Sequence, residues 1–431
     1  MIRAAVAAVG LLAATSAAAR EPAGLHTALE QLTRDGKFSG AVVIRGGEGV
    51  RFARGYGFAD PFKRRAFTPA TPADSGSLAK PVTAAAVLTL ERDGKIDLDA
   101  PVRQYLPEYP HAATTVRHLL AHSAGLTGGE SEQAITGKTN AQLIANARRE
   151  PAFAPGTAFA YCNYCYIALA LLIERVSARP YIDFVRERVA LPPTVTLRPA
   201  RLADWKGRAI GYRRAPNSRF EHADSYEGEL FYGSGNFRIS ALQFALWGTE
   251  WWQPRLAPIR TIAISPATIS AKMSGLTWGN WYCASHGRRC HYLGHHEGFH
   301  HMLYWDADRR ISVAMISNNS LAPALQQRLQ RAIVSFAVGR DAAARRELAA
   351  PFPDRPVEAG TYTMPFGETE VTQDGDRVSV SRNGLAYAAY PIGSGIRYVP
   401  GLDVYLSGGK GGVLHWLGLH EDYVGRRSDR R

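Results

Sequence analysis

The chain has 431 residues, 46% of them hydrophobic, and a formal net charge of +13 at pH 7. This composition excludes a mainly disordered protein, and the length exceeds what one hydrophobic core usually serves, so a large domain with a smaller companion is expected. The basic residues form no block of five or more like charges, which favours a basic solvated surface over a nucleic-acid-binding protein and leaves an anionic cell-wall polymer as the alternative partner.

Residues 1–19 have the pattern of a secretory signal peptide. Arg3 precedes an apolar run from Ala4 to Ala14, and small residues follow up to Ala19. The run is shorter than the roughly 20 apolar residues that cross a bilayer. We therefore expect cleavage after Ala19, no membrane span, and a periplasmic or secreted protein.

Residues 20–340 are expected to form the large domain. A β-hairpin is predicted between Gly40 and Tyr56, and an antiparallel meander after Trp278, because short β-rich runs there flank turn residues. Hydrophobic spacing and stop signals predict three helices. They run from near Ser77 to Gly94, from about Tyr164 to Val176, and from Pro323 to Val338.

The sequence pattern changes after residue 340. Residues 341–356 mix arginine, alanine and proline, as in a linker or a helical tail. Residues 357–431 contain short alternating segments separated by glycine-containing turns. That pattern predicts a small β-barrel or sandwich, to which we assign no chemistry.

The four cysteines fall into two close pairs, Cys162/Cys165 and Cys283/Cys290. An exported protein can form disulfides, so we expect a Cys283–Cys290 bond across a short loop between two strands, with Cys162 and Cys165 either paired with each other or reduced. Zinc is the alternative, because histidines lie nearby. The spacing of the second pair is longer than in usual zinc sites, and no metal is expected.

Ser77 and Lys80 stand three residues apart at the start of a predicted helix, so they share one face of its first turn. A serine hydroxyl becomes a good nucleophile when a nearby base takes its proton, and a lysine can be that base. The helix N-terminus adds partial positive charge. A Ser-x-x-Lys tetrad also occurs by chance, and its structural alternative is a helix-capping serine followed by a solvated lysine.

Two further motifs follow this tetrad in order: Tyr161-Cys162-Asn163 and His296-Glu297-Gly298. With these motifs, the sequence from Phe38 to Val338 resembles the β-lactamase-related serine hydrolases, which include class C β-lactamases, D-amino peptidases and esterases. The resemblance implies an α/β (α+β) fold of the penicillin-binding-protein type. In it, an antiparallel sheet is flanked by helices, an all-helical subdomain is attached, and no cofactor is needed.

The resemblance also implies roles for these residues. Ser77 would attack a carbonyl carbon, and Lys80 and Tyr161 would carry its proton to the leaving group. His296 and Lys80 would supply positive charge that favours the tyrosinate form of Tyr161. Asn163 would orient Lys80 and touch the substrate.

The third motif would bind the substrate through Glu297, Gly298 and Phe299, with the backbone amides of Ser77 and Phe299 as the oxyanion hole. His295 is an alternative to His296, since it follows a glycine as in many family members. We favour His296, because it alone puts a glycine at the motif's third position, where close backbone approach requires one.

Two more histidines, His118 and His122, lie in a segment that packs at the edge of the cleft in the family, and we expect them to be structural.

The expected function is that of an exported serine hydrolase acting through an acyl-enzyme on a small ester, amide or peptide, with cell-wall-derived compounds among the candidate substrates. Glu297 stands where a threonine or serine helps to hold the β-lactam carboxylate in the family's β-lactamases, so an esterase or peptidase is favoured over an efficient β-lactamase. A true class C-like β-lactamase and a catalytically silent penicillin-binding-like sensing module are the alternatives.

Overall fold

The computed structural model describes residues 24–126, 138–147, 150–157, 160–197, 204–214, 220–223, 232–250, 282–284, 289–296, 298–319, 323–349, 356–365, 367–375, 377–382, 385–391, 397–399, 404–409, 411–418 and 422–428. The predicted signal peptide and Glu297 lie outside these residues.

A six-stranded antiparallel sheet forms the centre of the large domain, in the order β10-β11-β12-β13-β1-β2. Its strands are β1 (Gly40–Gly46), β2 (Gly49–Tyr56), β10 (Tyr282–Ala284), β11 (Arg289–His296), β12 (Phe299–Asp306) and β13 (Ile311–Ser317). The predicted hairpin and meander are both present. They join through β1 and β13, where Ala41 pairs with Ile316.

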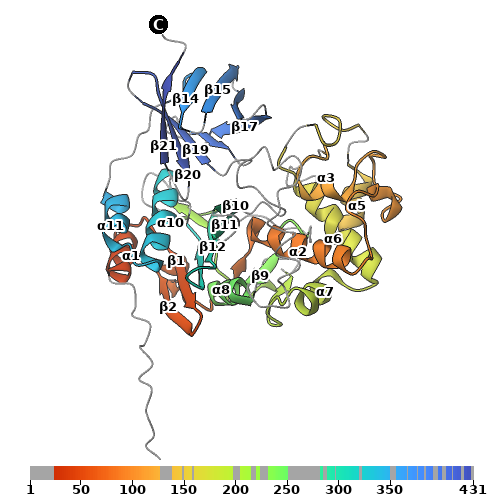
Figure 1. Ribbon diagram of the computed structural model, residues 1–431. Helices are drawn as coiled ribbons and strands as arrows, with labels where there is room; N and C mark the ends of the chain where they lie inside the picture. Colours follow the sequence, from red (N-terminus) through yellow and green to blue (C-terminus); the bar gives the residue numbers. More distant parts are fainter. Residues whose placement is uncertain are drawn as a thin grey trace, which may run out of the picture.

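Helices cover both faces of this sheet, and the alternation of side chains along β1 divides the core accordingly. Val42 and Ile44 pack with α1 (Leu25–Arg34), α10 (Pro323–Ala337) and α11 (Asp341–Ala349). Ala41 and Val43 belong to the core of the opposite face, which includes α8 (Ala241–Glu250). Figure 1 shows the sheet between these two layers.

The helical subdomain lies on the side of the sheet away from α1 and α10 (Figure 1). Its helices are α2 (Ala79–Arg92), α3 (Val116–Leu120), α5 (Asn140–Ala145), α6 (Asn163–Ser177) and α7 (Tyr181–Arg188). Helix α6 is buried at every position from Tyr164 to Ile173, as its dense apolar sequence predicted.

Short elements lie along the chain between these strands and helices. They are β3 (Phe58–Asp60), β4 (Arg65–Ala66), β5 (Ala73–Asp74), β6 (Thr196–Leu197), β7 (Tyr212–Arg214), β8 (Phe220–His222), β9 (Phe237–Ile239), and the 3₁₀ turns η1 (Gly76–Leu78) and η2 (Val102–Gln104). Strands β5, β9 and β6 form a small sheet, and β5 leads directly into the Ser77 turn.

The C-terminal region is a closed antiparallel barrel, rather than a sandwich, around Tyr362, Tyr387 and Trp416. Its strands are β14 (Gly360–Met364), β15 (Gly367–Asp374), β16 (Arg377–Arg382), β17 (Leu385–Pro391), β18 (Arg397–Val399), β19 (Val404–Gly409), β20 (Val413–Gly418) and β21 (Asp422–Arg427).

The segment 341–356, expected as a linker or helical tail, begins with helix α11. Ala344 of α11 is fully buried in the core of the large domain, and Glu347 pairs with Arg331 of α10 at 2.8 Å. This first part of the segment is therefore packed against the large domain. In the described part of the chain, no helix combines the length and apolar character that a membrane span requires.

Candidate active site

The nucleophile candidate Ser77 lies in a tight turn that its neighbours fix. Gly76 has φ 48°, a conformation that suits glycine, and its amide donates to Asp74 Oδ1 at 2.9 Å. The hydroxyl of Ser75 accepts from the Phe237 amide at 3.1 Å. The small β5-β9-β6 sheet thus holds the turn, and α2 begins directly after it.

Lys80 is fully buried and uses three neutral acceptors. Its Nζ donates to Ser77 Oγ at 3.0 Å, to Asn163 Oδ1 at 2.8 Å and to the Ser234 carbonyl oxygen at 2.9 Å. These bonds match the three donors of an ammonium group. They hold Nζ beside the serine oxygen, where the neutral amine form of Lys80, with a lone pair in place of one donor, can take the serine proton.

Tyr161 reaches the same serine oxygen from a different segment. Its hydroxyl donates to Ser77 Oγ at 2.7 Å, and Lys80 Nζ lies 4.7 Å from the centre of its ring. Asn163 is the first residue of α6, so the second motif is placed by the start of this helix. The structure therefore brings together the predicted residues Ser77, Lys80, Tyr161 and Asn163.

The Ser234 carbonyl is a functional group that the sequence analysis missed. It is held by its neighbour Gly233, whose carbonyl accepts from Thr83 Oγ1 at 2.6 Å. A Cβ atom at Gly233 would lie 2.4 Å from the Tyr166 carbonyl oxygen. The signal available in the sequence was the Gly233-Ser234-Gly235 run, which is typical of a close backbone approach.

On β11, the glycine that approaches the nucleophile turn is Gly294. A Cβ atom at this position would lie 3.1 Å from the Leu78 nitrogen and 3.2 Å from the Ser75 oxygen. Gly298 was expected in this place. It lies instead in the β11–β12 turn with φ 74°, against Gly211 and Tyr212.

The strand register relates the two histidines to this glycine. Positions two apart share one face of a strand, so position 296 belongs to the face of Gly294 and position 295 to the opposite face. Tyr292, two residues before Gly294, is 2% exposed and belongs to the same face. The side chains of His295 and His296 lie outside the described residues.

The hairpin also changes the expected oxyanion hole. His296 pairs with Phe299 across the two-residue turn. In such turns, the amide of the residue after the turn donates to the carbonyl oxygen of the residue before it. The Phe299 amide is therefore used by the hairpin. By the alternation of an antiparallel ladder, the His295 amide points away from β12, to the other edge of β11.

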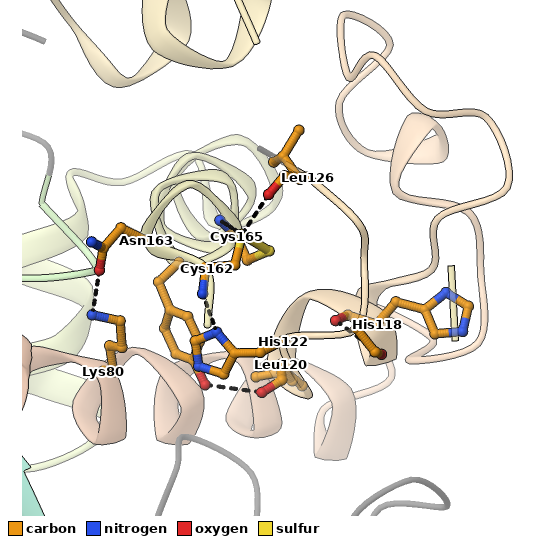
Figure 2. The surroundings of a disulfide bond; sticks show 10 residues. Lys80, His118, Leu120, His122, Leu126, Cys162, Asn163 and Cys165 are labelled. Carbon is orange, nitrogen blue, oxygen red and sulfur yellow. Dashed lines mark hydrogen bonds between the residues drawn. A yellow bond between two sulfur atoms is a disulfide. The ribbon is translucent and has the colours of Figure 1, made fainter. Parts of the chain in front are cut away.

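His122 lies immediately behind Tyr161 and is more than a packing residue at the cleft edge. The two rings stack with centroids 4.8 Å apart, and the Cys162 amide donates to His122 Nδ1 at 2.8 Å. Burial, with a further contribution from the Lys80 cation, holds the pKa of His122 well below its usual value. Figure 2 shows His122 next to the start of α6. His118 is half-buried and caps α3.

Cys162 and Cys165 are joined by a disulfide at the start of α6 (Figure 2). Cys290 is also disulfide-bonded and lies opposite Cys283 in the β10–β11 register, although the Cys283 side chain is not among the described ones. Among the described residues, there is no group of three or more histidine, cysteine, aspartate or glutamate side chains that could hold a metal ion.

A sequence model described as Beta-lactamase matches residues 25–337. The chain belongs to the β-lactamase family. Its curated relatives include penicillin-binding protein 4* of Bacillus subtilis, 28% identical over 39% of this chain and 39% of the relative. A D-aminopeptidase of Brucella canis is 33% identical over 36% of this chain and 31% of that protein. The alignments thus span about two fifths or less of these relatives.

Solved structures support the β-lactamase-family fold. A penicillin-binding protein homologue from Pyrococcus abyssi superimposes with a TM-score of 0.61 and 19% identity, covering 93% of this chain and 99% of that one. The D-amino acid amidase of Ochrobactrum anthropi gives a TM-score of 0.58 and 19% identity, with 76% and 99% coverage. The predicted fold class is confirmed.

Proposed function

We propose that this protein is an exported serine hydrolase that forms an acyl-enzyme on Ser77 and acts on an ester, amide or peptide rather than on β-lactams. The observation that carries the proposal is the position of Ser77 Oγ, within 3.0 Å of Lys80 Nζ and 2.7 Å of the Tyr161 hydroxyl. A serine oxygen between two proton carriers is what acyl transfer needs.

In the acylation step, Ser77 Oγ bonds to the substrate carbonyl carbon, and its proton passes to the neutral amine form of Lys80 or to the tyrosinate form of Tyr161. The leaving amine or alcohol takes this proton when its bond to the carbonyl carbon breaks. Water then attacks the acyl-serine by the reverse path, releasing the acid and restoring the Ser77 hydroxyl. The amides of Ser77 and His295 are proposed to bind the oxyanion, because Gly294 brings β11 against the nucleophile turn.

Glu297 supports a preference for substrates with a positive charge. It follows His296 directly in the His296-Glu297-Gly298 motif of the sequence. Two like charges ~4 Å apart cost about 4 kcal/mol at an effective dielectric near 20, so a carboxylate substrate would be disfavoured and an ammonium favoured. The D-aminopeptidase and D-amino acid amidase names among the relatives support an amine-bearing substrate.

A substrate panel tests the proposal. We would measure kcat/KM for a D-amino acid amide, its N-acetylated form, a neutral nitrophenyl ester and a cephalosporin, in the native protein, Glu297→Gln and Ser77→Ala. The native protein should prefer the free amine to the acetylated form and hydrolyse the cephalosporin poorly. Glu297→Gln should reduce the first preference about ten-fold, and Ser77→Ala should be inactive on all four.

Other results identify the alternatives. Efficient cephalosporin hydrolysis by the native protein would indicate a true β-lactamase and remove the role given to Glu297. Stable labelling of Ser77 without turnover would indicate a penicillin-binding-like sensing module. Export is tested separately: the mature protein recovered outside the cytoplasm should begin at Arg20.

A further inference from the structure

His122 holds the backbone on both sides of Tyr161. Its carbonyl oxygen accepts from the Ala160 amide at 2.9 Å, and its Nδ1 accepts from the Cys162 amide at 2.8 Å. The residues directly before and after the tyrosine are thus tied to one histidine. These two bonds fix the direction from which the Tyr161 side chain enters the site.

The ring of His122 also supports the side chain of Tyr161. The two rings are nearly parallel, at 13°, with centroids 4.8 Å apart. His122 stacks on Tyr166 of α6 as well, at 4.9 Å. The histidine ring therefore connects Tyr161 to α6, which is buried from Tyr164 to Ile173, and a rigid stack of this kind limits movement of the tyrosine hydroxyl.

Two features show that the surroundings of His122 constrain its backbone and its ring. His122 is fully buried and has φ 53°, in the left-handed region that a side-chain-bearing residue seldom adopts unless its surroundings require it. Its lowered pKa keeps the ring neutral, and the bond from the Cys162 amide requires Nδ1 to be the ring nitrogen without a proton.

We propose that His122 is a positioning residue, which holds the Tyr161 hydroxyl on Ser77 Oγ through its contacts with Ala160, Cys162 and the tyrosine ring. The inference rests on the proposed function, since it assigns His122 a role in that same site. His122 itself does not touch Ser77 in this account. It acts only through Tyr161, and this dependence can be measured.

Two variants separate the contacts. His122→Asn tolerates the left-handed backbone and keeps an acceptor oxygen, but loses the stacked ring. His122→Phe keeps a ring but has no acceptor for the Cys162 amide. His118→Asn is the matched control, because His118 lies on the same segment and caps α3. We expect both His122 variants to lower kcat on a nitrophenyl ester about ten-fold or more with KM within about three-fold, and the control to keep native kcat.

A double-mutant cycle with Tyr161→Phe decides the inference. If His122 acts through the tyrosine hydroxyl, adding His122→Asn to Tyr161→Phe should change kcat by less than about two-fold. Losses that multiply in the double variant, native kcat in both single His122 variants, or failure of both to fold would overturn it, because each assigns His122 another role or none.

The proposed function fails by a different result. If Ser77→Ala and Tyr161→Phe both keep native activity, the hydrolase site is wrong whatever His122 does. If those two variants lose activity and the cycle is multiplicative, only the positioning role of His122 is wrong.

Discussion

The side chains around Ser77 Oγ come from residues at the N-terminal ends of two helices. Lys80 is the second residue of α2, and Tyr161 and Asn163 lie at the start of α6. Helix starts are local features of a sequence, since caps, spacing and the first buried positions define them. Local features therefore pointed to Ser77 and Lys80 as a pair, whereas their meeting with Tyr161 and Asn163 was implied by the resemblance of the motifs to the β-lactamase-related serine hydrolases.

Tyr161→Phe should lower kcat by roughly 10² or more, because it removes one of the two groups that can carry the serine proton. The ring and its stacking on His122 are retained, so the melting temperature should stay within a few degrees. Steady-state kinetics on a nitrophenyl ester and a thermal melt measure both effects. A kcat within two-fold of the native value would show that Lys80 carries the proton without the tyrosine.

The third motif was harder to predict, because it depends on tertiary contact between β11 and the nucleophile turn. Gly294 and Gly298 are both plausible in the sequence. Only the packing of Gly294 against Leu78 and Ser75 distinguishes them. The Ser234 carbonyl was also beyond prediction, because a backbone acceptor has no residue type of its own.

Thr83 of helix α2 makes a hydrogen bond that supports the segment containing the Ser234 carbonyl. Thr83 Oγ1 contacts the Gly233 carbonyl and the Tyr181 hydroxyl, both at 2.6 Å. Thr83→Val keeps the shape but leaves these buried groups without that partner, so the free energy of unfolding should fall by about 1–3 kcal/mol. Urea unfolding measures the change.

Thr89→Val on the same helix is the control for this variant. Thr89 is equally buried, but its hydroxyl donates to Ala85 within α2, at 2.8 Å. That bond reaches no other segment, so we expect a smaller loss of stability and native kcat. Equal losses in the two variants would mean that the Thr83 network contributes nothing beyond a local helix bond.

At the scale of the whole molecule, hydrophobic spacing and turn residues predicted both a large mixed domain and a β-rich C-terminal region. Turn spacing could not distinguish a barrel from a sandwich, because closure depends on the pairing of β14 with β21. The role of α11 was likewise hidden, since a short alanine- and arginine-rich segment suits a helical tail as well as a packed helix.

Stability should fall as the pH drops below about 6.5, the ordinary pKa of histidine. Burial lowers the pKa of His291 to about 3, so between these values the unfolded chain binds a proton that the folded protein does not. The free energy of unfolding therefore decreases toward acid pH, by up to about 1.4 kcal/mol per pH unit from this group.

The variant His291→Gln should flatten this dependence between pH 7 and pH 5, measured by urea unfolding at each pH. Substitution of the exposed His222 by glutamine is the control for the loss of a histidine from the protein surface. An unchanged slope in His291→Gln would show that His291 does not have the buried neutral state described above.

The most direct test of the central claim is peptide mass spectrometry of the protein after reaction with a fluorophosphonate. We expect a single phosphonyl adduct on the peptide that contains Ser77, and none in Ser77→Ala, whose melting temperature should stay within a few degrees of native. An adduct on another residue, or labelling of Ser77→Ala at the native rate, would contradict Ser77 as the nucleophile.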